Sequence, residues 1–283
     1  MSDAIIGDSS IKTNELVASI VQRELITRAK LLPYVMDVSQ YAVPGMKSIE
    51  FPYANSFSVT KKLSGIAVDA SALTYEGDIL SLDQHAVIQW LIEKKASIQS
   101  SVDLEMDAIQ RASRAHAKQI DVDIIAELES GKYTTSVTYT GDTNTTLART
   151  DINGAIEVLE GNDVPVDEGD CALLIAPGQR REIMDISDFI DASKFGLPVL
   201  ASGFIGQIYG LPVVISNAVA DGVSYVFHKE GLAFGFQSAP EYDNDKELSN
   251  LAVRHSIDQL YGVRSMQKDD SNGSPFIVKI YKA

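Results

Sequence analysis

The strongest constraint on the fold is a long stretch without a helix breaker. Between Gly77 and Gly131 the sequence contains neither glycine nor proline. Its second half repeats apolar residues at helical spacing, with acidic residues in the early turns and basic residues after them. The apolar stripe comprises Val102, Met106, Ile109, Ala112, Ala117, Ile120, Ile124 and Leu128. This pattern predicts one helix over residues 97–130, about 45–50 Å long at the standard rise per residue, with Gly131 as its C-terminal cap. Such a helix indicates an elongated subunit.

Two further segments precede this helix. Residues 10–32 have apolar positions at helical spacing and end before Pro33, which predicts an amphipathic helix. After them, "SIEFPY" alternates Ile49, Phe51 and Tyr53, as a strand with one buried face does. Residues 45–93 are therefore expected to form a long two-stranded excursion with its tip within 58–74. An isolated hairpin of that length is marginally stable in water, so it should lie on another surface, such as a second chain.

A compact mixed region follows the long helix. Asp151 is the expected N-cap of a helix that ends at Gly161, and Pro177 opens a second helix. Apolar runs bounded by turns predict strands, and the first of them, "CALLIAP", is expected to be buried. The runs are "CALLIAP", "LPVVIS", "SYVFH", "LAFGF", "LSNLAVRHSIDQLYGVRSM" and "PFIVKIYKA".

Composition narrows the function classes. The chain of 283 residues has a net charge of −15, which disfavours sequence-specific binding of nucleic acid. No run of 18 apolar residues exists, and the N-terminal residues lack the basic start and apolar run of a secretory signal. The single cysteine, Cys171, allows no intrachain disulfide and no zinc site built on several thiolates, and it favours a reducing compartment or one with no redox requirement.

The glycine-rich stretch "SGFIGQIYGLPVVISN" raises the question of a phosphate-binding loop. Its glycines are Gly203, Gly206 and Gly210, and Pro212 follows. A dinucleotide loop needs G-x-G-x-x-G before a helix, whereas here the spacing is G-x-x-G-x-x-x-G and a strand follows. The glycines and Pro212 are therefore interpreted as structural turns that lead into a strand.

Motifs for catalysis or metal binding are absent from the sequence. The four histidines, His85, His116, His228 and His255, show no metal-binding spacing, and there is no G-x-S-x-G elbow. The acidic run "DNDKE" begins like a calcium loop but has Leu248 where the loop glycine belongs. We therefore expect no catalytic residues, no cofactor and no metal.

Two basic clusters remain as interface candidates. Lys61 and Lys62 lie at the expected excursion tip, near Ser64 and Asp69, and Arg180 with Arg181 lies at the start of a helix. Ordinary solvated side chains explain both clusters. The alternative is that they contact acidic patches on copies of the same chain, which the net charge favours.

Taken in order, these parts resemble a known family. The "G-x-x-x-I-x-F-P" strand (Gly45–Pro52) is followed by the long helix ending in "QIDVDIIAEL" (Gln119–Leu128). After these come "VP…LLIAP" (Val164–Pro177) and "GxIGxIxGxPVxxSN" (Gly203–Asn217). The sequence resembles a tailed-bacteriophage major capsid protein of the HK-ninety-seven-type fold, over residues 10–280.

The resemblance implies an α+β fold with five parts. These are an N-arm (1–44), an extended E-loop (45–93), a spine helix with peripheral domain (94–150), an axial domain (151–240) and return strands of the peripheral domain (241–283). It implies self-assembly into pentamers and hexamers that form an icosahedral head. The implied partners are copies of the chain, a scaffolding protein, a portal and packaged double-stranded DNA contacted non-specifically. No membrane partner is implied, and the head would be assembled in the host cytoplasm as part of the virion. The lysine–asparagine crosslink of some relatives is not carried over, because its acid and asparagine cannot be placed in this sequence.

Two other readings stay open at this point. An encapsulin shares the fold but encloses a cargo enzyme, and sequence alone does not separate it from a phage head. A soluble acidic enzyme or binding module would need a pocket with converging polar groups, for which the sequence offers no candidate motif.

Overall fold

The computed structural model describes residues 6–54, 59, 61–62, 72–100, 103–130, 134–138, 146–166, 169–184, 206–266 and 276–282. The helices are α1 (Ile6–Arg28), α2 (Lys94–Gln99), α3 (Leu104–Ser130), α4 (Arg149–Gly161) and α5 (Pro177–Met184). The first strands are β1 (Met36–Asp37), β2 (Ser48–Ala54), β3 (Tyr75–Ser81), β4 (Gln84–Glu93), β5 (Thr134–Thr138) and β6 (Cys171–Ile175). The later strands are β7 (Gln207–Ile208), β8 (Leu211–Ile215), β9 (Val223–His228), β10 (Leu232–Glu247), β11 (Ala252–Ser265) and β12 (Ile277–Tyr281).

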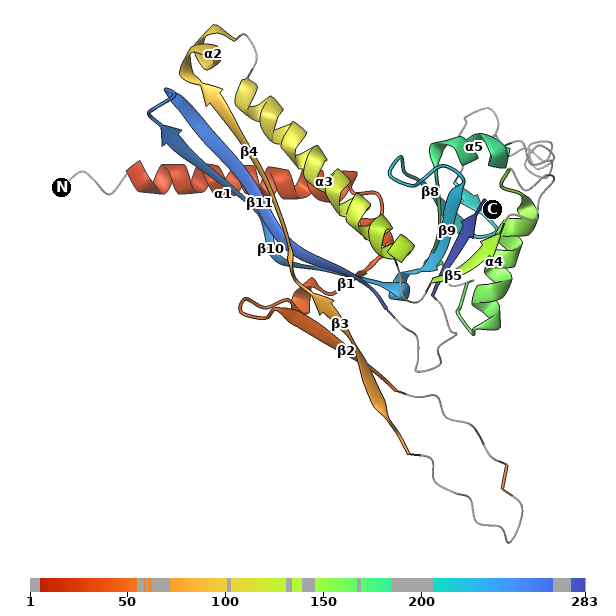
Figure 1. The fold of residues 1–283 in the computed structure, drawn as a ribbon. Coiled ribbons are helices and arrows are strands. Elements are labelled where there is room, and N and C mark those ends of the chain that lie inside the picture. Colours follow the sequence, from red (N-terminus) through yellow and green to blue (C-terminus); the bar gives the residue numbers. More distant parts are fainter. Residues whose placement is uncertain are drawn as a thin grey trace.

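Three sheets organise the subunit (Figure 1). An elongated four-stranded sheet has the order β1-β10-β11-β4, and a six-stranded sheet has the order β5-β12-β9-β6-β8-β7. Strands β2 and β3 form a separate antiparallel hairpin that projects away from both. In Figure 1 the six-stranded sheet, with α4 and α5, forms a compact unit to one side of the elongated sheet.

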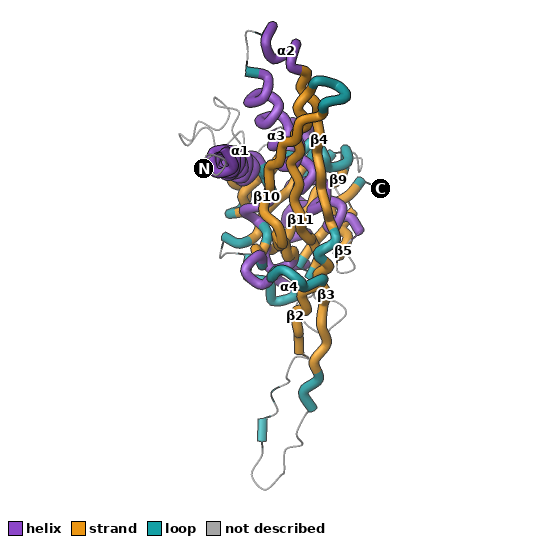
Figure 2. Tube along the Cα trace, turned by 90° about the vertical axis from the view of Figure 1, so that its left-hand side faces the viewer, coloured by secondary structure: helices purple, strands orange, loops and turns teal. Residues whose placement is uncertain are grey.

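Helices α1 and α3 lie on the same face of the elongated sheet (Figure 2). Apolar side chains from both helices and from the central strands form one buried cluster there. They are Val17, Val21, Ile109, Ala112, Tyr242 and Ile257. The amphipathic N-terminal helix is confirmed, but it ends at Arg28, and Pro33 lies in a following 3-10 turn, Leu32–Tyr34.

The long helix is confirmed in position but is shorter than expected. It begins at Leu104, and residues 94–99 form the separate helix α2. The break has a local cause, since Asp103 Oδ1 accepts hydrogen bonds from the Glu105 and Met106 N–H groups at 3.1 and 3.2 Å and so caps a new helix. With 27 residues α3 is about 40 Å long. Ile109, Ala112, Ala117, Ile120, Ile124 and Leu128 of the predicted stripe are buried, whereas Met106 is exposed. Val102 and Gly131 lie outside the described residues.

The largest buried cluster extends from the compact unit to α1, α3 and the elongated sheet. Strand β6 is buried at all five positions, as its apolar run predicted. Helix α4 ends at Gly161 as expected, but its N-cap is Ala148. Asp151 instead lies in the first turn, where its Oδ2 accepts a hydrogen bond from the Ala148 N–H at 2.8 Å. Asp151 thus still provides an acceptor for an N–H group at the start of the helix, but it does so from the first turn and not from the N-cap position.

Two boundaries differ from the sequence prediction because strand pairing is non-local. Residues 84–93, expected in the excursion, form β4 and pair along their whole length with β11. The hairpin therefore consists of β2 and β3, with Ser48 paired to Ser81 and Ala54 to Tyr75. Strand β12, expected with the return strands, lies between β5 and β9 in the six-stranded sheet.

Candidate assembly surfaces

Among the described residues, the projecting hairpin is anchored at its base. Ile49, Leu80 and Leu82 are buried there in a small cluster with Val38 and Met266. Beyond this base the strands pair only with each other, and large apolar side chains face solvent: Tyr75 is 67% exposed and Ile79 is 53% exposed. A two-stranded ribbon with exposed apolar side chains is marginal in water, so its surface is suited to contact with another molecule.

The predicted basic pair lies on this projection. Lys61 and Lys62 are exposed in the segment beyond β2 and β3, whereas Ser64 and Asp69 lie outside the described residues. Arg180 and Arg181 are exposed on α5, in the compact unit. The hairpin and α5 lie on different sides of the elongated sheet in Figure 1, so one subunit does not bring the two basic clusters together.

The glycine-rich stretch forms a tight hairpin at the edge of the six-stranded sheet. Strands β7 and β8 are joined by Tyr209 and Gly210, which have φ angles of 49° and 81°. Two consecutive positive φ values are typical of the two-residue turn that matches strand twist, and glycine adopts them without strain. Gly206 precedes β7, and Pro212 lies in β8, which pairs with the buried strand β6. Gly203 lies outside the described residues. Within residues 206–215 a turn leads into a strand, but Pro212 lies in β8 and not in the turn.

The N-terminal helix is attached to α3 through a buried carboxylate that sequence reasoning missed. Asp121 accepts hydrogen bonds from the Leu31 N–H at 3.1 Å and from the Lys30 N–H at 3.2 Å. Burial raises the pKa of Asp121, and the two N–H donors act against that increase. No local signal marks this contact, because Asp121 and Leu31 are 90 residues apart in the sequence.

A second polar cluster lies where α3 meets the elongated sheet. The Tyr242 hydroxyl lies 2.8 Å from Glu105 Oε1 and 2.7 Å from His255 Nδ1, and Trp90 stacks on the His255 ring. Burial lowers the pKa of His255 and raises the pKa of Tyr242 to about 12. His116, also buried, has a lowered pKa and donates Nε2–H to the Ile257 carbonyl oxygen at 3.3 Å. Neutral histidines and a protonated tyrosine act here as packing groups between α3 and the sheet.

The rest of the described side chains offer little reactive chemistry. Burial raises the pKa of Cys171 to about 12, so its thiol is not a nucleophile at neutral pH. Within the part of the chain that the structure describes, no three His, Cys, Asp or Glu side chains could hold a metal ion together. No helix among the described residues is long and apolar enough to cross a membrane.

Solved structures share this arrangement over nearly the whole chain. A structure from Mycobacterium phage Che8 matches with a TM-score of 0.73 and 20% identity, covering 89% of this chain and 90% of that one. The capsid of the cyanophage P-SCSP1u matches with a TM-score of 0.71 and 14% identity, covering 90% and 89%. A virus-like particle from Pyrococcus furiosus matches with a TM-score of 0.63 and 10% identity, covering 95% and 99%. No curated protein matches the chain.

The elongated sheet with its long helix, the compact second sheet and the projecting hairpin thus define the HK-ninety-seven-type capsid fold. The family model described as phage capsid protein matches residues 67–262, which is more than two thirds of the chain. The chain belongs to this family. It is a structural protein of a viral shell and a virion component, not an enzyme.

Proposed function

We propose that this chain is the major capsid protein of a tailed-phage head. Copies assemble into pentamers and hexamers, and these form an icosahedral shell around double-stranded DNA. The observation that carries the proposal is the β2–β3 hairpin, which is anchored at its base and exposes Tyr75 and Ile79 along its length. A neighbouring subunit supplies the surface on which this hairpin lies.

The parts of the chain take corresponding roles in the shell. Residues 1–44 are the N-arm, and the hairpin between β2 and β3 is the E-loop. Helix α3 and the elongated sheet form the peripheral domain, and the compact unit around β6 forms the axial domain. Lys61, Lys62, Arg180 and Arg181 are candidate contacts with other copies, because exposed basic side chains are attracted to subunits with a net charge of −15.

The shell has further partners in this proposal. A scaffolding protein guides assembly in the host cytoplasm, and a portal occupies one vertex. DNA is contacted without sequence preference. This suits an acidic chain, which can make few favourable contacts with the phosphate backbone.

Deletion of residues 58–72 tests the role of the hairpin. The expressed subunit should remain folded, because the core clusters lie elsewhere, but it should not form stable shells. Size-exclusion chromatography and negative-stain electron microscopy of the wild type and the deletion report the result. Normal particles from the deletion, or a wild-type subunit that stays monomeric with crowding agent and a scaffolding partner, would contradict the proposal.

The contents of native particles distinguish a phage head from an encapsulin. The similarity to a virus-like particle of Pyrococcus furiosus, which extends over 99% of that chain, is the reason to make this test. Particles recovered from the producing cells should contain double-stranded DNA of uniform length. A protein cargo without DNA would assign the chain to a nanocompartment.

A further inference from the structure

Strand β4 forms one edge of the elongated sheet, and no other described strand pairs with its outer side (Figure 2). Its other side pairs with β11 along all ten residues without a register shift. Proteins usually protect an edge of this length with a proline, a lysine or a bulge. The sequence of β4, "QHAVIQWLIE", contains neither proline nor lysine. The edge therefore has the features of a site that accepts a further strand.

The register indicates which backbone groups of β4 point to this edge. The Lys94 N–H, directly after β4, donates to the Leu251 carbonyl oxygen at 3.1 Å and so continues the ladder between β4 and β11. Because backbone groups point to alternate sides along a strand, the N–H and C=O groups of the even-numbered residues of β4 point to β11. The corresponding groups of the odd-numbered residues point to the free edge, and these residues are His85, Val87, Gln89, Leu91 and Glu93. An added strand can therefore form hydrogen bonds along most of the length of β4.

Apolar side chains on both faces of β4 lack full cover. Val87 and Leu91 are 45% and 48% exposed on the face opposite the helices. Ile88 and Trp90 are half-buried on the helix face, where they pack against the cluster between the helices and the sheet. A groove of about 390 Å3 lies beside the first half of β4, with Ala115 of α3 among its lining residues. Side chains of an added strand would cover these apolar residues, and such cross-strand pairs stabilise a sheet.

Three carboxylates surround the first half of β4. Asp83 is exposed directly before the strand, and Oδ2 of Asp258 on β11 lies 3.3 Å from His85 Nε2. Asp123 of α3 lines the groove, where its Oδ1 accepts a hydrogen bond from Gln119 Nε2 at 2.8 Å. These carboxylates favour an added strand that carries lysine or arginine.

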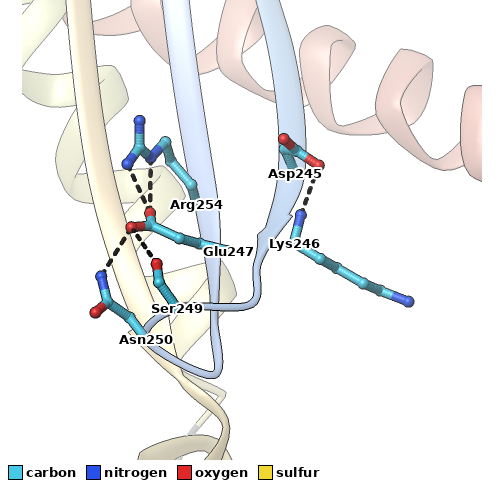
Figure 3. Close-up of polar contacts among 6 residues, drawn as sticks. All are labelled: Asp245, Lys246, Glu247, Ser249, Asn250 and Arg254. Carbon is cyan, nitrogen blue, oxygen red and sulfur yellow. Dashed lines mark hydrogen bonds and ion pairs between the residues drawn. The ribbon is translucent and has the colours of Figure 1, made fainter.

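The basic side chains that adjoin β4 in the sequence or in the sheet lie toward its other end. Arg254, which is paired with Leu91, is already engaged by Glu247, whose Oε2 accepts from Nη2 at 2.6 Å and from Nε at 3.1 Å (Figure 3). Lys94 and Lys95 belong to α2, beyond the last residue of β4. Because β4 spans about 30 Å, several times the screening length at physiological salt, these lysines do not neutralise the carboxylates at its start.

We infer that the free edge of β4 binds an extended, positively charged segment of a different protein as an added strand. Backbone hydrogen bonds provide the affinity, and the carboxylates of Asp83, Asp123 and Asp258 select lysine or arginine side chains. A second copy of this chain has a net charge of −15, so it suits an acidic edge less well than a basic protein does. The inference goes beyond the proposed function, because the site lies within one subunit and needs no shell.

A peptide of alternating lysine and valine, equal in length to β4 and labelled with a fluorophore, is the probe. Fluorescence anisotropy with the wild-type subunit should show saturable binding of this peptide. A glutamate–valine peptide of the same length should bind at least about tenfold more weakly. Absence of saturable binding of the lysine peptide, or equal binding of the two peptides, would overturn the inference.

The variant Gln89→Pro tests whether the peptide binds as a strand. The Gln89 N–H points to the free edge, so proline removes a hydrogen bond to an added strand and none to β11. Gln89→Thr is the matched control, because threonine keeps the N–H and suits a strand. Peptide affinity should fall about tenfold in Gln89→Pro and stay at the wild-type level in Gln89→Thr, with the unfolding temperature of both variants unchanged.

A charge variant tests the site without a change to the backbone. Asp83→Asn with Asp258→Asn removes two carboxylates beside β4 and should lower the affinity for the lysine peptide about fivefold. Asp243→Asn with Asp245→Asn is the matched control, because it makes the same change in net charge on β10, which β11 separates from β4. The control should bind the peptide with about wild-type affinity.

Each outcome bears on a separate part of the inference. Wild-type affinity in a folded Gln89→Pro subunit overturns strand addition, and equal losses in the two charge variants overturn the site at β4. Hydrogen exchange of particles that contain this chain alone identifies the occupant. Amides of residues 85–93 that become protected in such particles show that another copy fills the edge, which overturns the assignment to a different protein. Failure of the wild-type chain to form particles bears on the proposed function alone, because peptide binding is measured on the subunit.

Discussion

Replacement of Gly262 by alanine tests how the hairpin is fixed to the sheet. Gly262 lies in β11, and an added Cβ would be 2.3 Å from the carbonyl oxygen and 3.1 Å from the carbonyl carbon of Ser81, the last residue of β3. Ordinary contacts begin at 3.4 Å, so the backbone must move by about 1 Å. Ser81 cannot move freely, because β4 begins three residues later and pairs with β11. Overpacking of this kind costs about 1–3 kcal/mol.

The consequence should be larger for assembly than for folding. The shift occurs at the base of the hairpin, so it changes the direction in which the hairpin leaves the sheet. Urea unfolding of the subunit measures the loss of stability, and electron microscopy measures the loss of particles. We expect Gly262→Ala to reduce both the free energy of unfolding and the yield of particles.

A second glycine provides the control for this substitution. Gly154 lies inside α4, and an added Cβ there would make an ordinary contact with Val137 at 3.8 Å. Gly154→Ala should therefore raise the free energy of unfolding by up to about 1 kcal/mol, the difference in helix propensity. A Gly262→Ala subunit with wild-type stability and wild-type particle yield would refute the argument from close approach.

Three further predictions concern buried polar groups. Asp121→Ala leaves the Leu31 and Lys30 N–H groups without their acceptor and should lower the free energy of unfolding by about 2–4 kcal/mol in urea titrations; a change below about 0.5 kcal/mol would contradict this. His116 and His255 have pKa values lowered from 6.5 by burial, so the unfolded chain binds protons first and the unfolding temperature should fall as pH drops below about 6.5. The double variant His116→Gln with His255→Gln should flatten this dependence of the unfolding temperature on pH. If the dependence persists in the double variant, the two histidines are not its cause. Cys171, with its pKa raised to about 12, should resist thiol reagents at pH 8 until the subunit is unfolded, and rapid labelling of the folded subunit would count against its burial.

Sequence periodicity predicted the elements whose cause is local. The stripe through Ile109, Ile120 and Leu128 fixed the buried face of α3, and the apolar run of β6 identified a buried strand. The start of α3 was predicted too early because no glycine or proline marks it. The available signal was Asp103, an acidic side chain one residue before the first helical residue, Leu104, and suited to capping.

Strand partners depended on contacts far apart in the sequence and were not predicted. The alternation in residues 84–93 suits a hairpin strand and a sheet strand equally well, and only pairing with β11 decides between them. The turn between β10 and β11 (residues 248–251) also lacked a sequence signal, because Leu248 and Leu251 belong to a run that predicts a strand. Their exposure became visible only when the turn at 248–251 and the Glu247 contacts were known.

The place of β12 has a consequence for the timing of folding. This strand lies between β5 and β9, yet the ribosome makes it after both of them. Until it emerges, β5 has no partner in the six-stranded sheet, and β9 has an open edge on that side. A partly synthesised subunit therefore lacks a complete compact unit, while its hairpin has already been made. Synthesis order thus delays a complete six-stranded sheet until β12 is available, so a chain that stops before β12 lacks the strand that joins β5 to β9.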